Sequence, residues 1–176
     1  LTVQQGCNEG EDVIGASDKE IYIKKYFQQN IVAVETEGIP TPPTIQEIYS
    51  LDIDTLKKKR VIFSAKNFPG VISDALYLYD KQVFLFLVNG GLAFYSPQSS
   101  RLEKIIDMNW VAVDSYLGQI GDRICLDWND EVDLENKKII KDQEDCQQAH
   151  SDDSIPEQIE QFNLPTKTAQ IINGQS

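Results

Sequence analysis

The residues of this chain that could carry a charge-based function gather in its C-terminal half. Between Asp127 and Glu160 lie twelve acidic side chains and only three basic ones, in a chain whose formal net charge is −12. Such a segment can attract a basic protein and raise its rate of association, and the alternative is a purely solubilising surface. We predict that a basic protein partner docks here. The predicted partner-binding residues are Asp127, Asp130, Glu131, Asp133 and Glu135.

The same stretch carries oxygen ligands at alternate positions, which is how calcium loops of the EF-hand type begin. Val132 stands where that loop needs glycine, and Lys138 stands where it needs a bidentate glutamate. A solvated hairpin loop is therefore expected, with a weak calcium site as the alternative. We predict neither a resident metal nor a cofactor.

Residue types that support catalysis are sparse. His150 is the single histidine, and it lies in a polar acidic segment rather than on a rigid element that could assemble a catalytic triad. The glycines of residues 118–122 lack the Lys-Ser/Thr pair of a phosphate-binding loop. We expect a protein that is not an enzyme, and a hydrolase working through two carboxylates is the alternative.

The charge balance also bears on other partners. Nucleic acid binding requires Lys and Arg to neutralise phosphates, and here 28 acidic residues stand against 16 basic ones. No apolar run approaches the roughly 18 residues of a membrane helix. Residues 1–14 lack the basic start and apolar middle of a signal peptide. We therefore expect no nucleic acid partner and no transmembrane segment.

Three cysteines indicate a compartment. Cys125 and Cys146 are the candidate disulfide pair, and closing that loop would stabilise the fold by about 3 kcal/mol. Cys7 lies in Gln5–Asp12, a stretch that resembles the lipid-attachment region of bacterial lipoproteins, although Gln4 and Gln5 depart from that pattern. The resemblance implies a lipid tether, and a plain surface thiol is the alternative. We expect an extracytoplasmic protein, either secreted or periplasmic.

The elements that must position these residues are mainly strands. Residues 1–16 are predicted to be a flexible polar tether. The Ser17–Glu20 capping box and the apolar stripe that follows it predict an N-terminal helix. Residues 17–141 are expected to form one β-rich domain, and residues 142–176 an acidic segment with a short helix at 154–162.

The predicted fold is an antiparallel meander of about eight to ten strands that forms a sandwich or a barrel. Val83–Val88 is apolar on both faces and should be a central core strand, and the tight turn at Asn89–Gly91 should join it to the next strand. The candidate strands are residues 31–34, 45–53, 60–64, 74–79, 83–88, 92–96, 102–106, 110–116, 122–128 and 137–141.

Two resemblances bear on the architecture. Residues 48–62 and 94–106 share a Tyr-Ser hairpin pattern at an offset of 46 residues, which looks like the outer hairpin of a β-propeller blade, although no clear third copy follows. Residues 110–125 are similar to the late strand pair of lipocalins. That likeness implies a barrel that carries a small hydrophobic ligand. Its lining would include Phe84, Phe86, Phe94 and Tyr116.

Our principal functional expectation is a non-enzymatic extracytoplasmic binding protein, of the inhibitor or immunity-protein kind, that docks a basic partner through its acidic half. The lipocalin-like carrier is the alternative.

Overall fold

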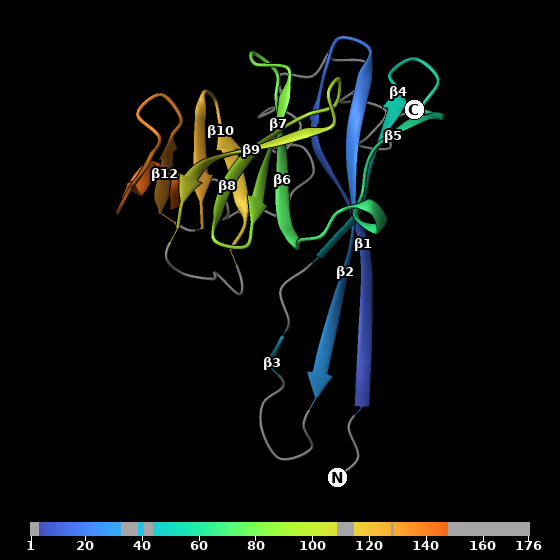
Figure 1. Cartoon of the computed structure of the whole chain (residues 1–176), viewed down its shortest axis with the longest axis horizontal. Coiled ribbons are helices and arrows are strands. Elements are labelled where there is room, and N and C mark those ends of the chain that lie inside the picture. The colour runs from blue at the N-terminus through green and yellow to red at the C-terminus, as the bar shows by residue number, and fades with distance from the viewer. Residues whose placement is uncertain (1–3, 33–38, 41–43, 109–114, 128, 148–176) are drawn as a thin grey trace. The chain divides into compact units, whose positions relative to one another are not determined.

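The computed structural model describes residues 4–32, 39–40, 44–108, 115–127 and 129–147 (Figure 1). The chain divides into two compact units, Leu1–Ser115 (unit 1) and Tyr116–Ser176 (unit 2). Nearly all of the described elements are strands, and they form three antiparallel sheets. The prediction of a mainly β antiparallel meander is therefore confirmed.

The first sheet of unit 1 has the strand order β1-β2-β4-β5, with β3 paired to β2. Its register aligns Val13 with Ile23 and Lys24 with Ile48. A short 3-10 helix, η1 (Ala65–Asn67), follows the last strand. The strands are β1 (Gln4–Ala16), β2 (Glu20–Val32), β3 (Ile39–Pro40), β4 (Thr44–Asp52) and β5 (Lys58–Ser64).

The predicted N-terminal helix is wrong, because the Ser17–Glu20 box forms a hairpin turn. The backbone amide of Ser17 donates to the carbonyl of Glu20 at 2.8 Å, and the Ser17 hydroxyl accepts from the Glu20 amide at 3.1 Å. The same residues that cap a helix thus close a turn between two strands. Branched residues such as Val13 and Ile23 favour this extended pairing. Strand β1 also occupies most of the segment that was expected to be a tether.

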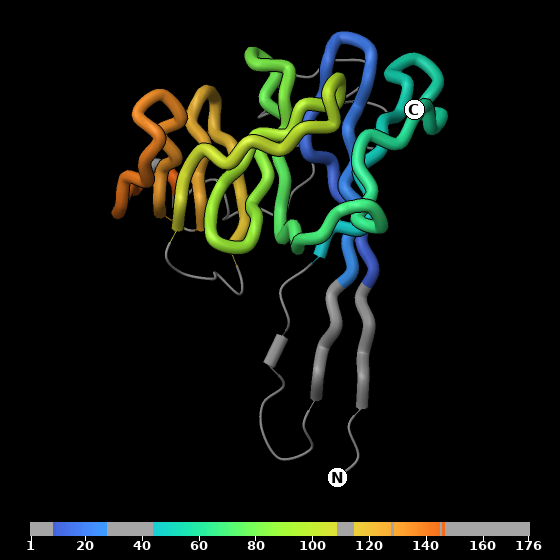
Figure 2. Tube along the Cα trace, viewed as in Figure 1, coloured from blue at the N-terminus to red at the C-terminus, as the bar shows by residue number. Residues whose placement is uncertain are grey.

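The second sheet of unit 1 is a meander with the strand order β6-β7-β8-β9 (Figure 2). The hairpin predicted at Asn89–Gly91 is present, since Val88 pairs with Gly91. A Cβ atom at position 91 would lie 2.1 Å from the carbonyl oxygen of Ile106, so this position requires glycine. The strands are β6 (Ile72–Leu78), β7 (Val83–Val88), β8 (Gly91–Ser96) and β9 (Arg101–Asp107).

Strand β7 is the core strand that its sequence predicted. Phe84 and Phe86 are fully buried, and they pack against aromatic rings of the first sheet. Tyr22 lies edge-on to Phe84 with ring centroids 5.0 Å apart, and Phe63 lies edge-on to Phe86 at 5.3 Å. The cover that was expected from a helix is thus supplied by the first sheet. One aromatic core joins the two sheets of unit 1.

Two buried charges join the same two sheets. Lys24 on β2 lies 2.6 Å from the carboxylate of Asp74 on β6, and the two side chains are 17% and 4% exposed. Burial alone would lower the pKa of Lys24, but the charges and hydrogen bonds of Asp74 and Asp12 together outweigh it and raise that pKa. The pair therefore fixes the position of one sheet on the other.

Unit 2 contains the third sheet, with the strand order β10-β11-β12-β13. Paired residues in an antiparallel sheet share a face, so Leu126 and Asp130 share one face, and Cys125 and Glu131 share the other. Residues 127–135, expected as a loop, contain strand β12. The elements are β10 (Leu117–Ile120), β11 (Arg123–Leu126), β12 (Asp130–Asp133), β13 (Lys138–Ile140) and the helix α1 (Glu144–Gln147).

None of the three sheets closes on itself within the described residues, so the predicted closed barrel is not found there. The two Tyr-Ser hairpins of the sequence are β4–β5 and β8–β9, which are the last two strands of the first and second sheets. The helix predicted at residues 154–162 lies outside the described residues, as does His150.

Candidate functional site

Three of the five predicted partner-binding residues have partners within unit 2. Asp127 follows β11, and its carboxylate accepts a hydrogen bond from the backbone amide of Tyr116 at 3.3 Å. Asp130 is 6% exposed and forms a close ion pair with Lys141. These two carboxylates therefore stabilise the sheet from within.

Asp133 closes the turn between β12 and β13. Its carboxylate accepts hydrogen bonds from the backbone amide and the side-chain amide of Asn136, both at 2.9 Å. These hydrogen bonds lower the pKa of Asp133, with a smaller contribution from the charge of Lys138. The side chain is ionised at neutral pH, and both of its carboxylate oxygens accept hydrogen bonds within the turn.

Glu131 and Glu135 are the outward pair. Glu131 is half-buried on β12, on the face opposite to the buried Val132, and Glu135 is exposed in the turn that follows. The structure therefore separates the five residues into three whose carboxylates form hydrogen bonds or ion pairs and two, Glu131 and Glu135, whose carboxylates form none among the described residues. We call Glu131 and Glu135 the outward acidic pair.

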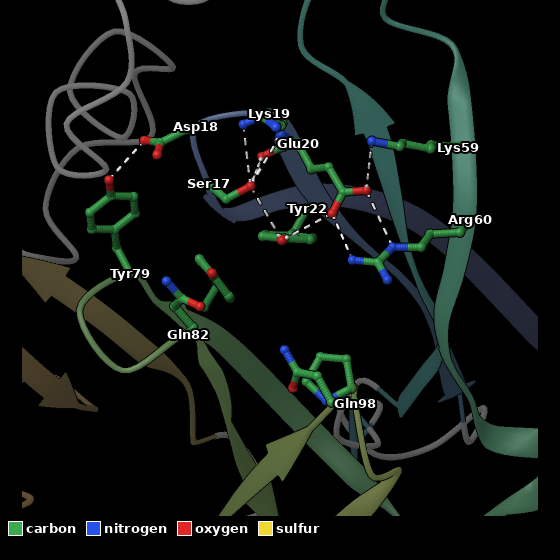
Figure 3. A pocket seen from close by; sticks show the side chains of 12 residues that line it. Ser17, Asp18, Lys19, Glu20, Tyr22, Lys59, Arg60, Tyr79, Gln82 and Gln98 are labelled. Carbon is green, nitrogen blue, oxygen red and sulfur yellow. Dashed lines mark hydrogen bonds and ion pairs between the residues drawn. The ribbon is translucent and has the colours of Figure 1, made fainter.

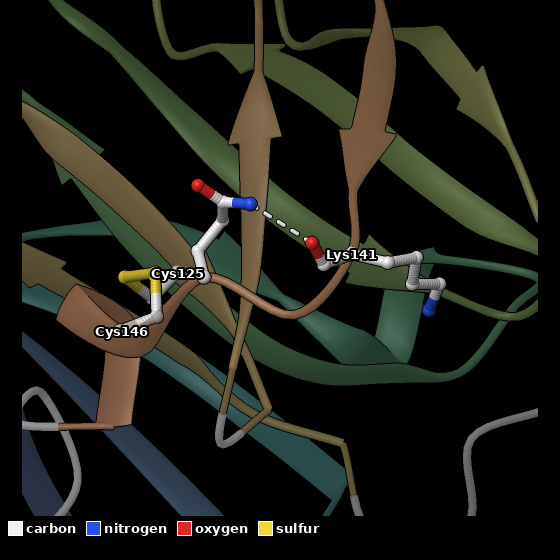
Figure 4. The surroundings of a disulfide bond; sticks show 4 residues. Cys125, Lys141 and Cys146 are labelled. Atoms are coloured by element: carbon white, nitrogen blue, oxygen red, sulfur yellow. Dashed lines mark hydrogen bonds between the residues drawn. A yellow bond between two sulfur atoms is a disulfide. The ribbon is translucent and has the colours of Figure 1, made fainter.

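The predicted disulfide is present in unit 2. Cys125 on β11 and Cys146 on α1 are joined, with Cα atoms 5.5 Å apart, and both residues are fully buried (Figure 4). The side-chain amide of Gln143 donates to the carbonyl of Lys141 at 2.9 Å. The disulfide ties α1 to the face of the sheet that carries Glu131. Cys7 lies on β1 with its backbone opposite Gln29, and its lipid attachment stays a prediction.

A second candidate site, which the sequence reasoning missed, is a polar pocket of about 630 Å³ in unit 1 (Figure 3). It lies where the β1–β2 turn meets β5, the β6–β7 turn and the β8–β9 turn. We call it the turn pocket. Its lining residues are Ser17, Asp18, Lys19, Glu20, Tyr22, Lys59, Arg60, Tyr77, Tyr79, Gln82, Pro97 and Gln98.

Glu20 is the buried centre of a network on one wall of the turn pocket. Its carboxylate accepts from Arg60 Nε at 3.2 Å and from Arg60 Nη2 at 2.8 Å. The hydroxyls of Ser50 and Tyr22 each donate to it at 3.2 Å, and Lys59 Nζ lies 3.4 Å away. Burial alone would raise the pKa of Glu20, but the hydrogen bonds and charges of Arg60 and Lys59 lower it.

The opposite wall carries an exposed aromatic ring. Tyr79 is 54% exposed, and its hydroxyl donates to the carboxylate of Asp18 at 2.8 Å. Figure 3 shows Gln82 beside Tyr79 and Gln98 across the pocket from Arg60. The guanidinium of Arg60 borders the same space. Arginine, amide and tyrosine groups thus face one another across it.

Two sequence features contribute residues to this pocket, but neither of them predicted it. The Ser17–Glu20 box indicated a helix, and the run Lys57–Arg60 indicated only a polar turn. Their meeting with residues 79–82 and 97–98 depends on the packing of two sheets. No local pattern encodes that packing.

The residues expected to line a carrier cavity are placed differently. Phe84 and Phe86 are filled core positions, with the Phe86 ring stacked on Tyr95 at 5.0 Å. Phe94 is half-buried on β8, and Tyr116 is half-buried at the start of unit 2. Because Phe84 and Phe86 pack against other rings, they do not face an open ligand space.

Among the described residues, no group of three or more His, Cys, Asp or Glu side chains is arranged to hold a metal ion. Over the same part of the chain, no helix is both long enough and apolar enough to cross a membrane. Comparison with protein families, characterised proteins and solved structures finds no match to this chain.

Proposed function

We propose that the chain is a non-enzymatic extracytoplasmic binding protein, of the inhibitor or immunity-protein kind, that docks a basic protein partner through unit 2. The observation that carries this proposal is the uneven charge of the two units. Residues 116–147 contain nine acidic and four basic side chains. Over the whole of unit 2, residues 116–176, thirteen acidic side chains stand against five basic ones, whereas the longer unit 1, residues 1–115, contains fifteen acidic and eleven basic ones.

The contacts within unit 2 reduce the set of proposed docking residues from five to two. Asp127, Asp130 and Asp133 support the sheet and its turns, so the outward acidic pair is the part of the surface best able to meet a partner. Complementary charge at such a surface speeds encounter and excludes acidic proteins. The three supporting carboxylates add to the same negative field.

The disulfide supports the extracytoplasmic location. Disulfides persist in oxidising compartments and are rare where glutathione keeps thiols reduced. The bond between Cys125 and Cys146 holds α1 against the sheet, which keeps the surface around Glu131 in one shape. A rigid acidic surface loses less entropy on docking than a mobile one.

The full chain, immobilised, should capture a basic protein from the extracytoplasmic fraction of its source organism. The capture should weaken strongly at about 0.5 M salt, because exposed charges are then screened beyond a few ångströms. The E131Q/E135Q variant should lose the partner. A control variant, D80N/E103Q, removes the same charge from exposed positions of unit 1 and should retain it. Capture of the same protein by E131Q/E135Q would refute the proposal.

A further inference from the structure

We propose that the turn pocket of unit 1 binds a saccharide. This inference is independent of the docking proposed for unit 2, because it rests on other residues in the other unit. Four turns and strand ends, far apart in the sequence, contribute to the pocket (Figure 3). Its volume of about 630 Å³ lies within the range of small-molecule sites.

The acidic groups of the pocket already have partners. Glu20 is held by Arg60, Lys59 and two hydroxyls, and Asp18 accepts from Tyr79. A free cation would therefore have to displace an existing partner. These interactions also hold two groups that face the ligand space. Glu20 holds the guanidinium of Arg60, and Asp18 holds the ring of Tyr79.

The remaining groups suit a ligand rich in hydroxyls. Both Nε and Nη2 of Arg60 donate to Glu20, and the guanidinium retains further N–H donors beside the open space. The amide of Gln82 offers a donor and an acceptor. The amide of Gln98 offers its N–H donors, while its oxygen already accepts from the Ser96 hydroxyl at 2.9 Å. A hydroxyl both donates and accepts, so neighbouring hydroxyls of a sugar ring match an amide better than a purely anionic or cationic group would.

Tyr79 supplies the surface that a sugar ring also needs. Tyr79 is 54% exposed as a residue, and the hydrogen bond from its hydroxyl to Asp18 holds its ring in one orientation. A pyranose has an apolar C–H face that packs on such a ring. Its equatorial hydroxyls project from the edge of the sugar, where they can form hydrogen bonds with the polar groups of the pocket. An exposed tyrosine with an anchored ring, in one pocket with two glutamine amides, is therefore the arrangement that carries the proposal.

Charge favours a neutral ligand over an anion. The pocket is lined by three basic and two acidic side chains, and the basic Arg60 and Lys59 both lie against Glu20. The whole chain carries a formal charge of −12, which repels anions at long range. A neutral saccharide meets neither obstacle. We therefore assign the site to neutral mono- to trisaccharides.

The test is an NMR titration of the full ¹⁵N-labelled chain with cellobiose, maltotriose and N,N′-diacetylchitobiose. At least one sugar should shift the amide resonances of residues 17–22, 59–60, 77–82 and 97–98, and leave those of unit 2 in place. Acetate and phosphate serve as anion probes. Shifts of the same amides with an anion but with none of the three sugars would overturn the proposal, as would no shift with any sugar.

Two variants locate the binding. Tyr79→Ala and Gln98→Ala should each weaken the sugar at least tenfold, because they remove the ring face and one amide. Both side chains are exposed, so the fold should survive, and far-UV circular dichroism checks this. The matched controls Val71→Ala and Gln46→Ala alter exposed positions outside the pocket and should bind as the wild type does. Unchanged affinity in Tyr79→Ala would place the sugar elsewhere and overturn the assignment.

Discussion

Units 1 and 2 use the same antiparallel meander but treat their charges and their cores differently. In unit 1, fifteen acidic side chains stand against eleven basic ones, and several pair across strands or sheets, as in Lys24–Asp74 and Glu20–Arg60. In unit 2 acidic side chains exceed basic ones by more than two to one over residues 116–147. Charge in unit 1 therefore mainly builds the structure, whereas unit 2 has an excess that is available to a partner.

The two units also differ in what stabilises their cores. Unit 1 packs two sheets through a cluster of aromatic rings, which bury large apolar areas. The strands of unit 2 are three or four residues long, and a disulfide ties its sheet to α1. A small sheet has little area to bury, so a covalent link makes a larger share of its stability. The comparison predicts that each unit fails by a different route.

The largest effect should come from the aromatic core. Phe86→Ala should destabilise unit 1 by about 3–5 kcal/mol, because it removes a fully buried ring and leaves a cavity. Guanidinium denaturation followed by circular dichroism measures the loss. Val61→Ala, at a position 48% exposed, is the control and should cost less than about 1 kcal/mol. Equal costs for the two variants would contradict the packing described for unit 1.

The second-largest loss of stability should come from removing the disulfide. C125S/C146S should destabilise unit 2 by about 3 kcal/mol, because the unfolded chain regains the freedom that the link removes. Hydrogen exchange resolves the units separately, and protection should fall in residues 117–140. Protection in β6–β9 should not change. If protection fell equally in both units, the disulfide would not be a local support of unit 2.

A smaller effect concerns acid stability in unit 1. The folded pKa of Glu20 is lowered, so its contribution is present above the ordinary pKa near 4.5 and is lost as the pH falls through the folded value. Arg60→Gln removes the main partner, and it should bring the pKa of Glu20 upward and start acid unfolding at a higher pH. The expected cost at neutral pH is about 1–2 kcal/mol, since Arg60 is half exposed. A pH titration of the carboxyl carbon resonance checks the direction. No upward shift would contradict the network.

The smallest effect on stability should belong to the outward acidic pair. E131Q/E135Q should change the free energy of unfolding by no more than about 0.5 kcal/mol, because neither carboxylate supports the sheet as Asp130 does. Thermal unfolding beside the wild type measures this. A large loss would mean that the pair is structural, and the distinction drawn between supporting and outward carboxylates in unit 2 would fail.

Local patterns predicted the features that local physics controls. The apolar run of β7 predicted a core strand, and Asn89–Gly91 predicted the hairpin that follows it. Cys125 and Cys146 were the correct pair. The Ser17–Glu20 box misled because its hydrogen bonds close either a helix end or a strand turn. Only pairing of β1 with β2 and of β2 with β4 decides between these outcomes.

The candidate sites were predictable only in part. The acidic segment was visible from composition, but the inward use of Asp130 and the turn formed by Asp133 depend on Lys141 and Asn136. Alternation along β12 could have separated Asp130 from Glu131 had that strand been recognised. The turn pocket had no local signal, because Tyr79, Gln98 and Arg60 come together only when the two sheets pack.

The most direct test of the central claim is the affinity of the captured partner for three forms of the full chain, measured by isothermal titration calorimetry at about 0.1 M salt. The outward acidic pair is proposed to dock that partner. E131Q/E135Q should bind at least tenfold more weakly than the wild type, and D80N/E103Q should bind as tightly as the wild type. Equal affinity for E131Q/E135Q and the wild type would contradict the proposed docking surface.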